Sequence, residues 1–299
     1  MTQIGKPASV EFKRILNKIK NRGTQTNPRG QKVKEILLQT LEINPLYPII
    51  DFPDREFHYK YLVGEIAWYL RKDNKLEYIK PFSNFWDNIK NIDGTVNSNY
   101  GTLLFGKQLR WVYDSLINDK DSRQAIAFLN QPKFQYPGNK DFVCTMYLNF
   151  FIRDNKLHMK MTIRSNDMVY GFSYDAPFFS FVMQHMYLWL KETKYPELEL
   201  GTYYHYADNI HYYEQHFSLM NKILKEDMKT PPLFVLKKRM FHIEEDGTYI
   251  LYDDAKEFCD KAYNKALDKN SDQSFKSYYD LMNDSGFFII DASFNSNSV

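Results

Sequence analysis

The stretch that decides the fold is residues 141–175, which opens with Asp141-Phe142-Val143-Cys144-Thr145 and closes with Gly171-Phe172-Ser173-Tyr174-Asp175. Two apolar runs, 143–152 and 157–163, are separated by the polar residues 153–156. This pattern predicts a β-hairpin with a short turn. Cys144 at the start of one strand and Arg164 at the end of the other then lie at the same end of the hairpin, and we expect them to face one cleft.

The composition excludes several classes of protein. The 299 residues are 43% hydrophobic and 17% aromatic, which is enough for a sizeable core, and 39 Lys and Arg against 37 Asp and Glu argue against a protein that coats nucleic acid. No apolar run approaches the roughly 18 residues of a membrane span, and residues 1–10 lack the apolar segment of a signal peptide. Two distant cysteines indicate no disulfide framework. We expect a soluble protein of a reducing cytoplasm, or of the host cytoplasm if a virus encodes it.

Apolar periodicity predicts further elements. Helical spacing occurs at 9–21, 56–71, 107–117, 176–191 and 253–267, and a strand is expected at 200–213. Glu65 stands alone among apolar residues in the second of these helices. If it is buried, its pKa is raised and it must be paired, hydrogen-bonded or protonated; the alternative is an exposed position on an amphipathic helix.

A dense polar motif follows the hairpin. Arg164-Ser165-Asn166-Asp167 ends the second strand, Gly171 follows four residues later, and Asp175 four residues after that. Combined with Cys144, this motif resembles the thymidylate synthase family, and within it the deoxycytidylate hydroxymethylases. The resemblance runs from about Arg22 to about His216. It implies an α+β fold, with a mixed sheet packed by helices, and a homodimer formed sheet to sheet.

The resemblance also implies a division of the chain. We expect residues 1–216 to form the catalytic domain and residues 217–299 to be a C-terminal extension packed on it. The tail at 287–299 does not resemble the closing C-terminus of the synthases.

In such an enzyme the thiolate of Cys144 adds to C6 of a pyrimidine, and C5 then attacks a one-carbon unit. The donor that the resemblance implies is 5,10-methylenetetrahydrofolate, and no spacing of His, Cys, Asp and Glu is typical of a metal site. Glu65 resembles the carboxylate that orders the catalytic water and relays protons. Tyr100, in Asn99-Tyr100-Gly101, resembles a tyrosine that hydrogen-bonds near the nucleophile or the water chain.

Binding roles follow from the same resemblance. Phosphate contacts are expected from Arg164, Ser165 and an early arginine, for which we favour Arg29 over Arg22. Arg123 is expected to reach the partner's site across a dimer interface; many synthases have a second arginine where this chain has Gln124. His211 and Tyr213, two apart on a strand and so on one face, resemble the pair that holds the sugar 3′-hydroxyl. The expected folate contacts are Trp86, Asp167, Gly171 and Tyr174.

Asp175 decides which base is read. Synthases place asparagine here, whose carboxamide matches N3–H and O4 of uracil. Cytosine presents an amino donor and an unprotonated N3, and a carboxyl group can accept from the amino group and share a proton with N3. We therefore predict dCMP over dUMP, as a small-molecule substrate of an enzyme without nucleic-acid or membrane partners.

The sequence leaves open what happens to the carbon that is attached at C5. Hydride transfer gives a methyl group and needs a closed, dry site, whereas water gives a hydroxymethyl group, which we favour. The alternatives are a thymidylate synthase, a dUMP hydroxymethylase and a dCMP-methylating enzyme. An inactive nucleotide-binding or RNA-binding relative is a further alternative, against which Cys144 argues, because a binding module needs no thiol.

Overall fold

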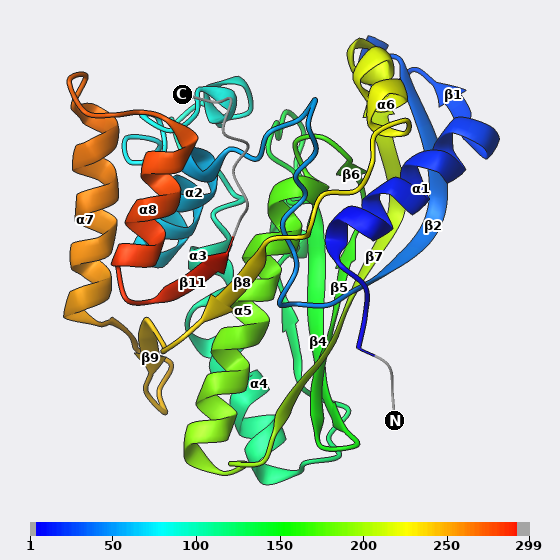
Figure 1. Ribbon diagram of the computed structural model, residues 1–299. Coiled ribbons are helices and arrows are strands. Elements are labelled where there is room, and N and C mark those ends of the chain that lie inside the picture. The colour runs from blue at the N-terminus through cyan, green and yellow to red at the C-terminus, as the bar shows by residue number, and fades with distance from the viewer. Residues whose placement is uncertain (1–3, 292–299) are drawn as a thin grey trace.

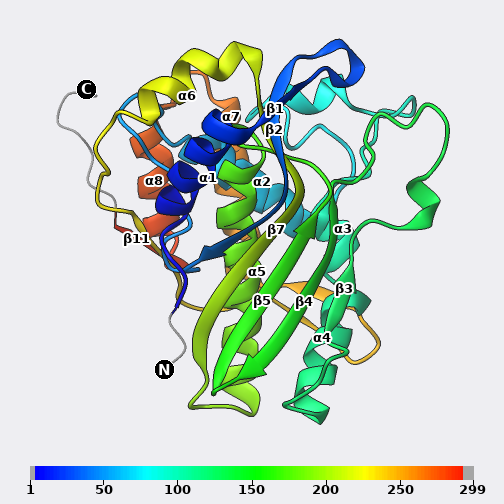
Figure 2. The ribbon, with the colours of Figure 1, turned by 90° about the vertical axis from the view of Figure 1, so that its right-hand side faces the viewer.

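The computed structural model describes residues 4–291 and centres on one mixed sheet. Its strands follow the order β1-β2-β7-β5-β4-β3, with β6 pairing β7 (Figures 1 and 2). The pairs β5–β7 and β6–β7 are parallel and the other neighbours are antiparallel. The bounds are β1 (Thr24–Thr26), β2 (Val33–Ile43), β3 (Ile126–Phe128), β4 (Thr145–Arg153), β5 (Lys156–Ile163), β6 (Asn166–Asp167) and β7 (Glu199–Tyr213).

The predicted hairpin is confirmed as β4 and β5, which pair up to Arg153 and Lys156. Asp154 and Asn155 close the turn with φ of 49° and 57°. Aspartate and asparagine adopt this left-handed conformation more readily than other residues with side chains. The strand predicted at 200–213 is confirmed as β7.

Helices pack against the sheet and form the core with it. Figure 2 shows β7, β5 and β4 in front of α5 (Phe172–Thr193). The other helices of this part are α1 (Ala8–Arg22), α2 (Tyr59–Arg71), α3 (Tyr100–Leu104), α4 (Lys107–Asn118) and the short turns η1 (Pro28–Gly30), η2 (Phe85–Asn88) and η3 (Pro132–Phe134). The helices predicted at 9–21, 56–71 and 107–117 are therefore confirmed within a few residues.

The helix predicted at 176–191 begins earlier, at Phe172. Gly171 occupies its N-terminal cap position, and Asp175 lies in the first turn, where the helix dipole favours a negative charge. Tyr174 and Asp175 are therefore held by a rigid helix start and not by a loop.

Residues after β7 pack on the same body. They form η4 (Glu214–His216), α6 (Phe217–Ile223), α7 (Asp253–Leu267), α8 (Phe275–Asp284) and two small antiparallel pairs, β8 (Leu233–Leu236) with β11 (Phe288–Asp291) and β9 (Phe241–Ile243) with β10 (Tyr249–Leu251). The helix predicted at 253–267 is confirmed as α7. It lies along α2, where Arg71 pairs with Asp260 at 2.8 Å and the buried Cys259 Sγ is 3.8 Å from the Ala67 carbonyl oxygen.

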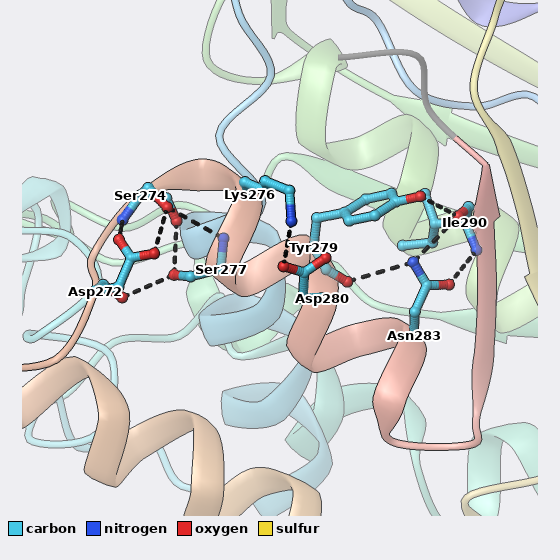
Figure 3. A network of polar contacts seen from close by, with 8 residues as sticks. All are labelled: Asp272, Ser274, Lys276, Ser277, Tyr279, Asp280, Asn283 and Ile290. Carbon is cyan, nitrogen blue, oxygen red and sulfur yellow. Dashed lines mark hydrogen bonds and ion pairs between the residues drawn. The ribbon is translucent and has the colours of Figure 1, made fainter. Parts of the chain in front are cut away.

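A polar network ties α8 to β11 (Figure 3). Asn283 accepts from the backbone N–H of Ile290 at 2.7 Å and donates to its carbonyl at 3.1 Å, and Tyr279 donates to the same carbonyl at 2.8 Å. Ser274 caps the start of α8 by accepting from the Ser277 N–H. This fixes the chain as far as Asp291, and most of the tail considered above, 292–299, lies outside the described residues.

No helix within residues 4–291 has the length and apolarity that a bilayer crossing requires.

Candidate active site

The end of the β4–β5 hairpin brings a thiol and a guanidinium together, as the sequence predicts. Cys144 directly precedes β4 and Arg164 directly follows β5, and the Arg164 N–H donates to the Cys144 carbonyl at 3.0 Å. Arg164 Nη2 lies 3.4 Å from Cys144 Sγ and also donates to the carbonyl of Phe142, over whose ring the guanidinium stacks. The arginine is therefore fixed by backbone contacts beside the sulfur.

Two opposing effects act on the thiol. Burial raises the pKa of Cys144, and the negative charges of Asp175 and Asp141 raise it further, whereas Arg164 and Arg29 lower it. Arg29 is exposed in η1, yet its charge reaches both Cys144 and Tyr213, which favours it over Arg22 as the early arginine of the site. Thiolate formation at Cys144 therefore depends on the neighbouring cations.

Asp175 projects from the first turn of α5 into the same cluster. Its Oδ2 accepts a hydrogen bond of 2.7 Å from Asn166 Nδ2. Burial raises the pKa of Asp175 to about 7, an effect that the Asn166 bond opposes and the charge of Asp167 reinforces. The charge of Asp175 in turn raises the pKa of Cys144 and of Tyr100. The carboxyl group and the sulfur are therefore close enough to influence each other directly.

Glu65 is buried, which decides between the buried and the exposed positions that the sequence left open. Only 6% of it is exposed, and its Oε1 accepts from the hydroxyls of Tyr61 at 2.9 Å and Tyr69 at 3.1 Å. Burial raises the pKa of Glu65 to about 8; the two phenols lower it and Asp175 raises it. Sequence reasoning missed both tyrosines, although positions four before and four after Glu65 lie on its helix face.

Tyr100 links the carboxylate side of the cluster to the thiol side. Its ring stacks on that of Tyr69, with the ring centres 5.5 Å apart. Its hydroxyl accepts a hydrogen bond of 2.9 Å from Oγ1 of Thr145, the residue that follows Cys144. Burial raises its pKa well above the usual range, so the phenol keeps its proton. That proton remains available for donation within the site.

We expect phenylalanine in place of Tyr61 or Tyr69 to change the pH dependence of turnover. Each substitution removes one hydrogen bond that stabilises the Glu65 carboxylate, so the Glu65 pKa should rise above about 8. A step that needs the ionised form should then move to higher pH by about one pH unit, because a bond to a charged group contributes about 1.5 kcal/mol. A pH profile of turnover measures the shift, and unchanged profiles in both variants would contradict the role of the phenols.

The two aromatic residues that are predicted to contact the folate lie next to α2, the helix that carries Glu65. Trp86, in η2, is buried, with its ring 4.9 Å from that of Trp68. Tyr174 is 8% exposed and packs edge-on against Tyr61 at 4.6 Å. Both side chains therefore belong to the wall that surrounds Glu65.

Asp167 sits on β6 with its Oδ2 accepting from the Tyr170 N–H at 2.6 Å. Burial raises the pKa of Asp167 to about 6, and the guanidinium of Arg55 opposes this shift. Arg55 Nη2 donates to the Val169 carbonyl at 2.6 Å, so it also fixes the turn after Asp167. No motif in the sequence distinguishes Arg55 from other loop arginines, and sequence reasoning missed it.

His211 and Tyr213 point to one side of β7, as the spacing predicts, with their rings 5.3 Å apart. Asn209 Nδ2 donates to Glu35 at 2.8 Å, so its carbonyl oxygen faces His211 Nδ1, also at 2.8 Å. His211 must then carry its proton on Nδ1. Its Nε2 is left as an acceptor, and the orienting residues Asn209 and Glu35 were not predicted.

Of the remaining predicted residues, Ser165 and Gly171 lie beside the Cys144 cluster and Arg123 lies away from it. Ser165 is half-buried between Arg164 and β6, and Gly171 caps α5 where an added Cβ would stand 2.7 Å from Asn166 Nδ2. Arg123 is exposed in the loop before β3 and does not join the Cys144 cluster within the chain. Within residues 4–291, no group of three or more His, Cys, Asp or Glu side chains suits a metal ion.

Comparison with known proteins defines the class. Residues 10–256 match the thymidylate synthase family, so the chain belongs to that family. The thermostable thymidylate synthase A from Bacillus subtilis superposes with a TM-score of 0.64 at 19% identity, over 84% of this chain and 96% of that one. The predicted α+β fold of the synthases is thereby confirmed.

Curated relatives narrow the comparison further. The chain is 32% identical over 222 residues to deoxyuridylate hydroxymethyltransferase of Bacillus phage SP01, across 67% of this chain but only 55% of that protein's length. It is 27% identical over 172 residues to deoxycytidylate 5-hydroxymethyltransferase of Enterobacteria phage T4, across 54% of this chain and 70% of that protein. The named relatives therefore differ in the base that they modify.

Proposed function

We propose that this protein transfers a one-carbon unit from 5,10-methylenetetrahydrofolate to C5 of dCMP, with water completing a 5-hydroxymethyl group. The observation that carries the proposal is the convergence of a thiol, a fixed guanidinium and a carboxyl group, on Cys144, Arg164 and Asp175. The family and its hydroxymethyltransferase relatives support the reaction class.

Cys144 is the nucleophile of this mechanism. Its thiolate adds to C6 of the pyrimidine, which makes C5 electron-rich, and the same sulfur leaves again once the new carbon is attached and the C5 proton is lost. Arg164 stabilises the thiolate and, with Arg29 and Ser165, binds the nucleotide phosphate; an arginine fork suits phosphate oxygens. The phosphate thus docks at the end of the molecule that holds the sulfur.

Asp175 supplies the preference for cytosine. With a pKa near 7 it carries a proton in a substantial fraction of molecules at neutral pH. In that form one oxygen accepts from the amino group and the other donates to N3, and a protonated N3 draws electrons from C6 and so eases thiolate attack. A synthase-like asparagine has no acidic proton to share.

The role of His211 at the sugar follows from its tautomer, and the role of Glu65 at the water follows from its burial. The free His211 Nε2 accepts from the 3′-hydroxyl, and Tyr213 donates to the same oxygen. Glu65, ionised above about pH 8 and partly below it, takes a proton from the water that attacks the new exocyclic carbon. Tyr100 donates to the bound nucleotide or to this water.

The residues on the folate side fit a pterin. Among the described residues, none hydrogen-bonds the buried Asp167 Oδ1, and such an acceptor suits a pterin N–H. Trp86 and Tyr174 offer aromatic packing surface, and Gly171 permits the close approach of the Asp167 backbone, whose carbonyl oxygen would stand 2.9 Å from an added Cβ. The folate, when bound, supplies the one-carbon unit.

We further propose a homodimer in which two sheets face each other. Leu37, Leu38 and Phe128 are large apolar side chains on strands of the sheet, and each is more than half exposed. A second copy packed on the sheet would cover such residues. Arg123, exposed and outside the cluster of its own chain, would then reach the partner's phosphate.

Mixed dimers test the role of Arg123. Arg123→Ala and Cys144→Ala homodimers should each turn over poorly, but their mixture should recover about a quarter of native activity. Random pairing makes half of the dimers mixed, and each mixed dimer has one complete site. Subunit exchange followed by an activity assay measures this, and no recovery in demonstrably mixed dimers would exclude an arginine supplied in trans.

We also propose that residues 1–216 form the catalytic domain and 217–299 an extension packed on it. Contacts between α7 and α2 support the packing of the extension on the catalytic domain, because they buttress the helix that carries Glu65. We place the enzyme in the cytoplasm, which is the host cytoplasm if a phage encodes it.

Release of tritium from C5-labelled dCMP and dUMP, with product mass spectrometry, tests the proposal. We expect dCMP to react in preference and to gain a hydroxymethyl group without oxidation of the folate. The 32% identity to a deoxyuridylate hydroxymethyltransferase favours dUMP as the second candidate substrate. Exclusive turnover of dUMP would overturn the base assignment, and dihydrofolate formation would indicate methylation instead.

A further inference from the structure

A buried chain of hydrogen bonds runs from Asp175 into the core. Asn166 Nδ2 donates to Asp175 Oδ2 at 2.7 Å, Asn166 Oδ1 lies 2.9 Å from His205 Nε2, and His205 Nδ1 lies 2.8 Å from the Tyr203 hydroxyl. Asn166 is 2% exposed, and His205 and Tyr203 are fully buried. None of these three residues has a place in the mechanism above.

The direction of every bond in the chain can be deduced from Asp175. An ionised carboxylate only accepts, so the amide nitrogen of Asn166 must face it and the amide oxygen must face His205. His205 is neutral, because burial lowers its pKa to about 3, and its single proton must therefore be on Nε2. Its Nδ1 is left as an acceptor for the proton of Tyr203, whose own pKa burial raises well above the usual range.

The surrounding structure holds the chain in place. The Phe172 ring packs edge-on against His205 at 4.8 Å. An added Cβ on Gly171 would stand 2.7 Å from Asn166 Nδ2, so the glycine permits the approach of the amide to Asp175. Asn166 on β6 and His205 on β7 belong to neighbouring parallel strands, which limits their relative movement.

The choice of which Asp175 oxygen donates and which accepts matters, because a carboxylic acid can fit either base. Cytosine needs the acid O–H at N3 and the bare oxygen at the amino group, whereas uracil needs the bare oxygen at N3–H and the O–H at O4. A proton that moves freely between the two oxygens serves both. A donor fixed on Oδ2 disfavours protonation there and confines the proton to Oδ1.

We propose that Tyr203, His205 and Asn166 form a specificity relay that holds the Asp175 carboxyl group in one donor–acceptor polarity, so that the site accepts one pyrimidine and rejects the other. The relay deepens the proposed function and rests on it for the identity of the preferred base, dCMP. Tyr203 acts through His205 and Asn166 and is a positioning residue. Without its hydroxyl, His205 can move its proton to Nδ1, and the Asn166 amide can then reverse and present its oxygen to Asp175.

The test compares Tyr203→Phe and Asn166→Ala with the native enzyme. The readout is the ratio of kcat/KM for dCMP to kcat/KM for dUMP, measured by tritium release from C5. Each substitution should lower this ratio by about 10- to 100-fold, the range that a hydrogen bond to a charged group produces. Tyr278→Phe is the matched control, because Tyr278 is equally buried but lies on α8, where it donates to Gln273 and contacts no member of the relay, and it should leave the ratio unchanged.

The pH dependence of kcat/KM distinguishes loss of the hydrogen bond to Asp175 from a general loosening of the site. Asn166→Ala removes a bond that lowers the Asp175 pKa, so the pH dependence of kcat/KM for dCMP should move upward. The titratable groups that interact with Asp175 all remain in the Asn166→Ala variant: Asp167 on β6, Glu65 and Tyr69 on α2, Tyr100 on α3, Cys144 before β4 and Tyr203 on β7.

The outcomes distinguish the relay from the proposed function. If the native enzyme turns over neither nucleotide, the proposed function itself fails. If it turns over dCMP and both variants keep the native ratio within about twofold, the relay is refuted while the function stands. If Tyr203→Phe does not fold, Asn166→Ala decides the question alone, since its ratio and its pH profile report on the same polarity.

Discussion

Replacing Cys144 with alanine is expected to lower turnover by at least about 10³-fold, the scale on which enzymes lose rate without their nucleophile. The sulfur lies 3.4 Å from a guanidinium that is tied to the backbone, so the surrounding structure should persist without it. Binding of dCMP should therefore survive, because the phosphate, sugar and base contacts come from other side chains. Tritium release from C5-labelled dCMP measures the first effect and calorimetric titration with dCMP measures the second.

The only other cysteine in the chain provides the control. Cys259 is fully buried in α7 against α2, and burial raises its pKa to about 12, so it is a packing group and not a nucleophile. Cys259→Ala should lower stability by about 1–2 kcal/mol, a small cavity cost, and leave tritium release near the native rate. Full activity in Cys144→Ala would refute the covalent mechanism.

Replacing Asp175 with asparagine is expected to reverse the choice of base. The amide cannot share an acidic proton with N3 of cytosine, but it offers a donor and an acceptor to O4 and N3–H of uracil. The ratio of kcat/KM for dCMP to that for dUMP should fall by about 10²-fold or more, because polar groups left unpaired in a buried site discriminate strongly. Competition between the two labelled nucleotides measures this ratio directly.

Asp167→Asn is the matched control for this substitution. It makes the same chemical change at another buried carboxylate, whose proposed contact is the folate and not the base. It should raise the KM for the folate, and it should shift the pH profile because the Asp167 charge raises the Asp175 pKa, while dCMP remains preferred over dUMP. An unchanged base preference in Asp175→Asn would contradict the assignment of Asp175 as the reader of the base.

Features set by local periodicity could be predicted from the sequence. Cys144 and Arg164 flank a hairpin whose turn was recognisable, so their approach follows from antiparallel register. The apolar helix left the burial of Glu65 open and only the family resemblance favoured it, whereas Tyr61 and Tyr69 could have been predicted from the spacing of four residues. The start of α5 was placed too late, because Gly171 and the polar residues before it are also typical of a loop.

Long-range contacts could not be predicted in this way. His205 meets Asn166 only because β6 lies parallel to β7 after a crossover through α5, and no periodicity in either segment encodes that pairing. Arg55 reaches the turn after Asp167 across 114 residues of sequence, from a loop with no motif of its own. Such contacts depend on how the elements pack and not on the order of residues within one of them.

The most direct test is a search for the covalent link between Cys144 and the pyrimidine. In 5-fluoro-dCMP the substituent at C5 cannot leave as a proton does, so the reaction should stop after the sulfur and the one-carbon unit are both attached to the ring. Peptide mass spectrometry after incubation with 5-fluoro-dCMP and 5,10-methylenetetrahydrofolate should find both on the peptide that contains Cys144, and far less with 5-fluoro-dUMP. An enzyme that converts dCMP but forms no adduct on Cys144, or forms one at another residue, would contradict the proposed mechanism.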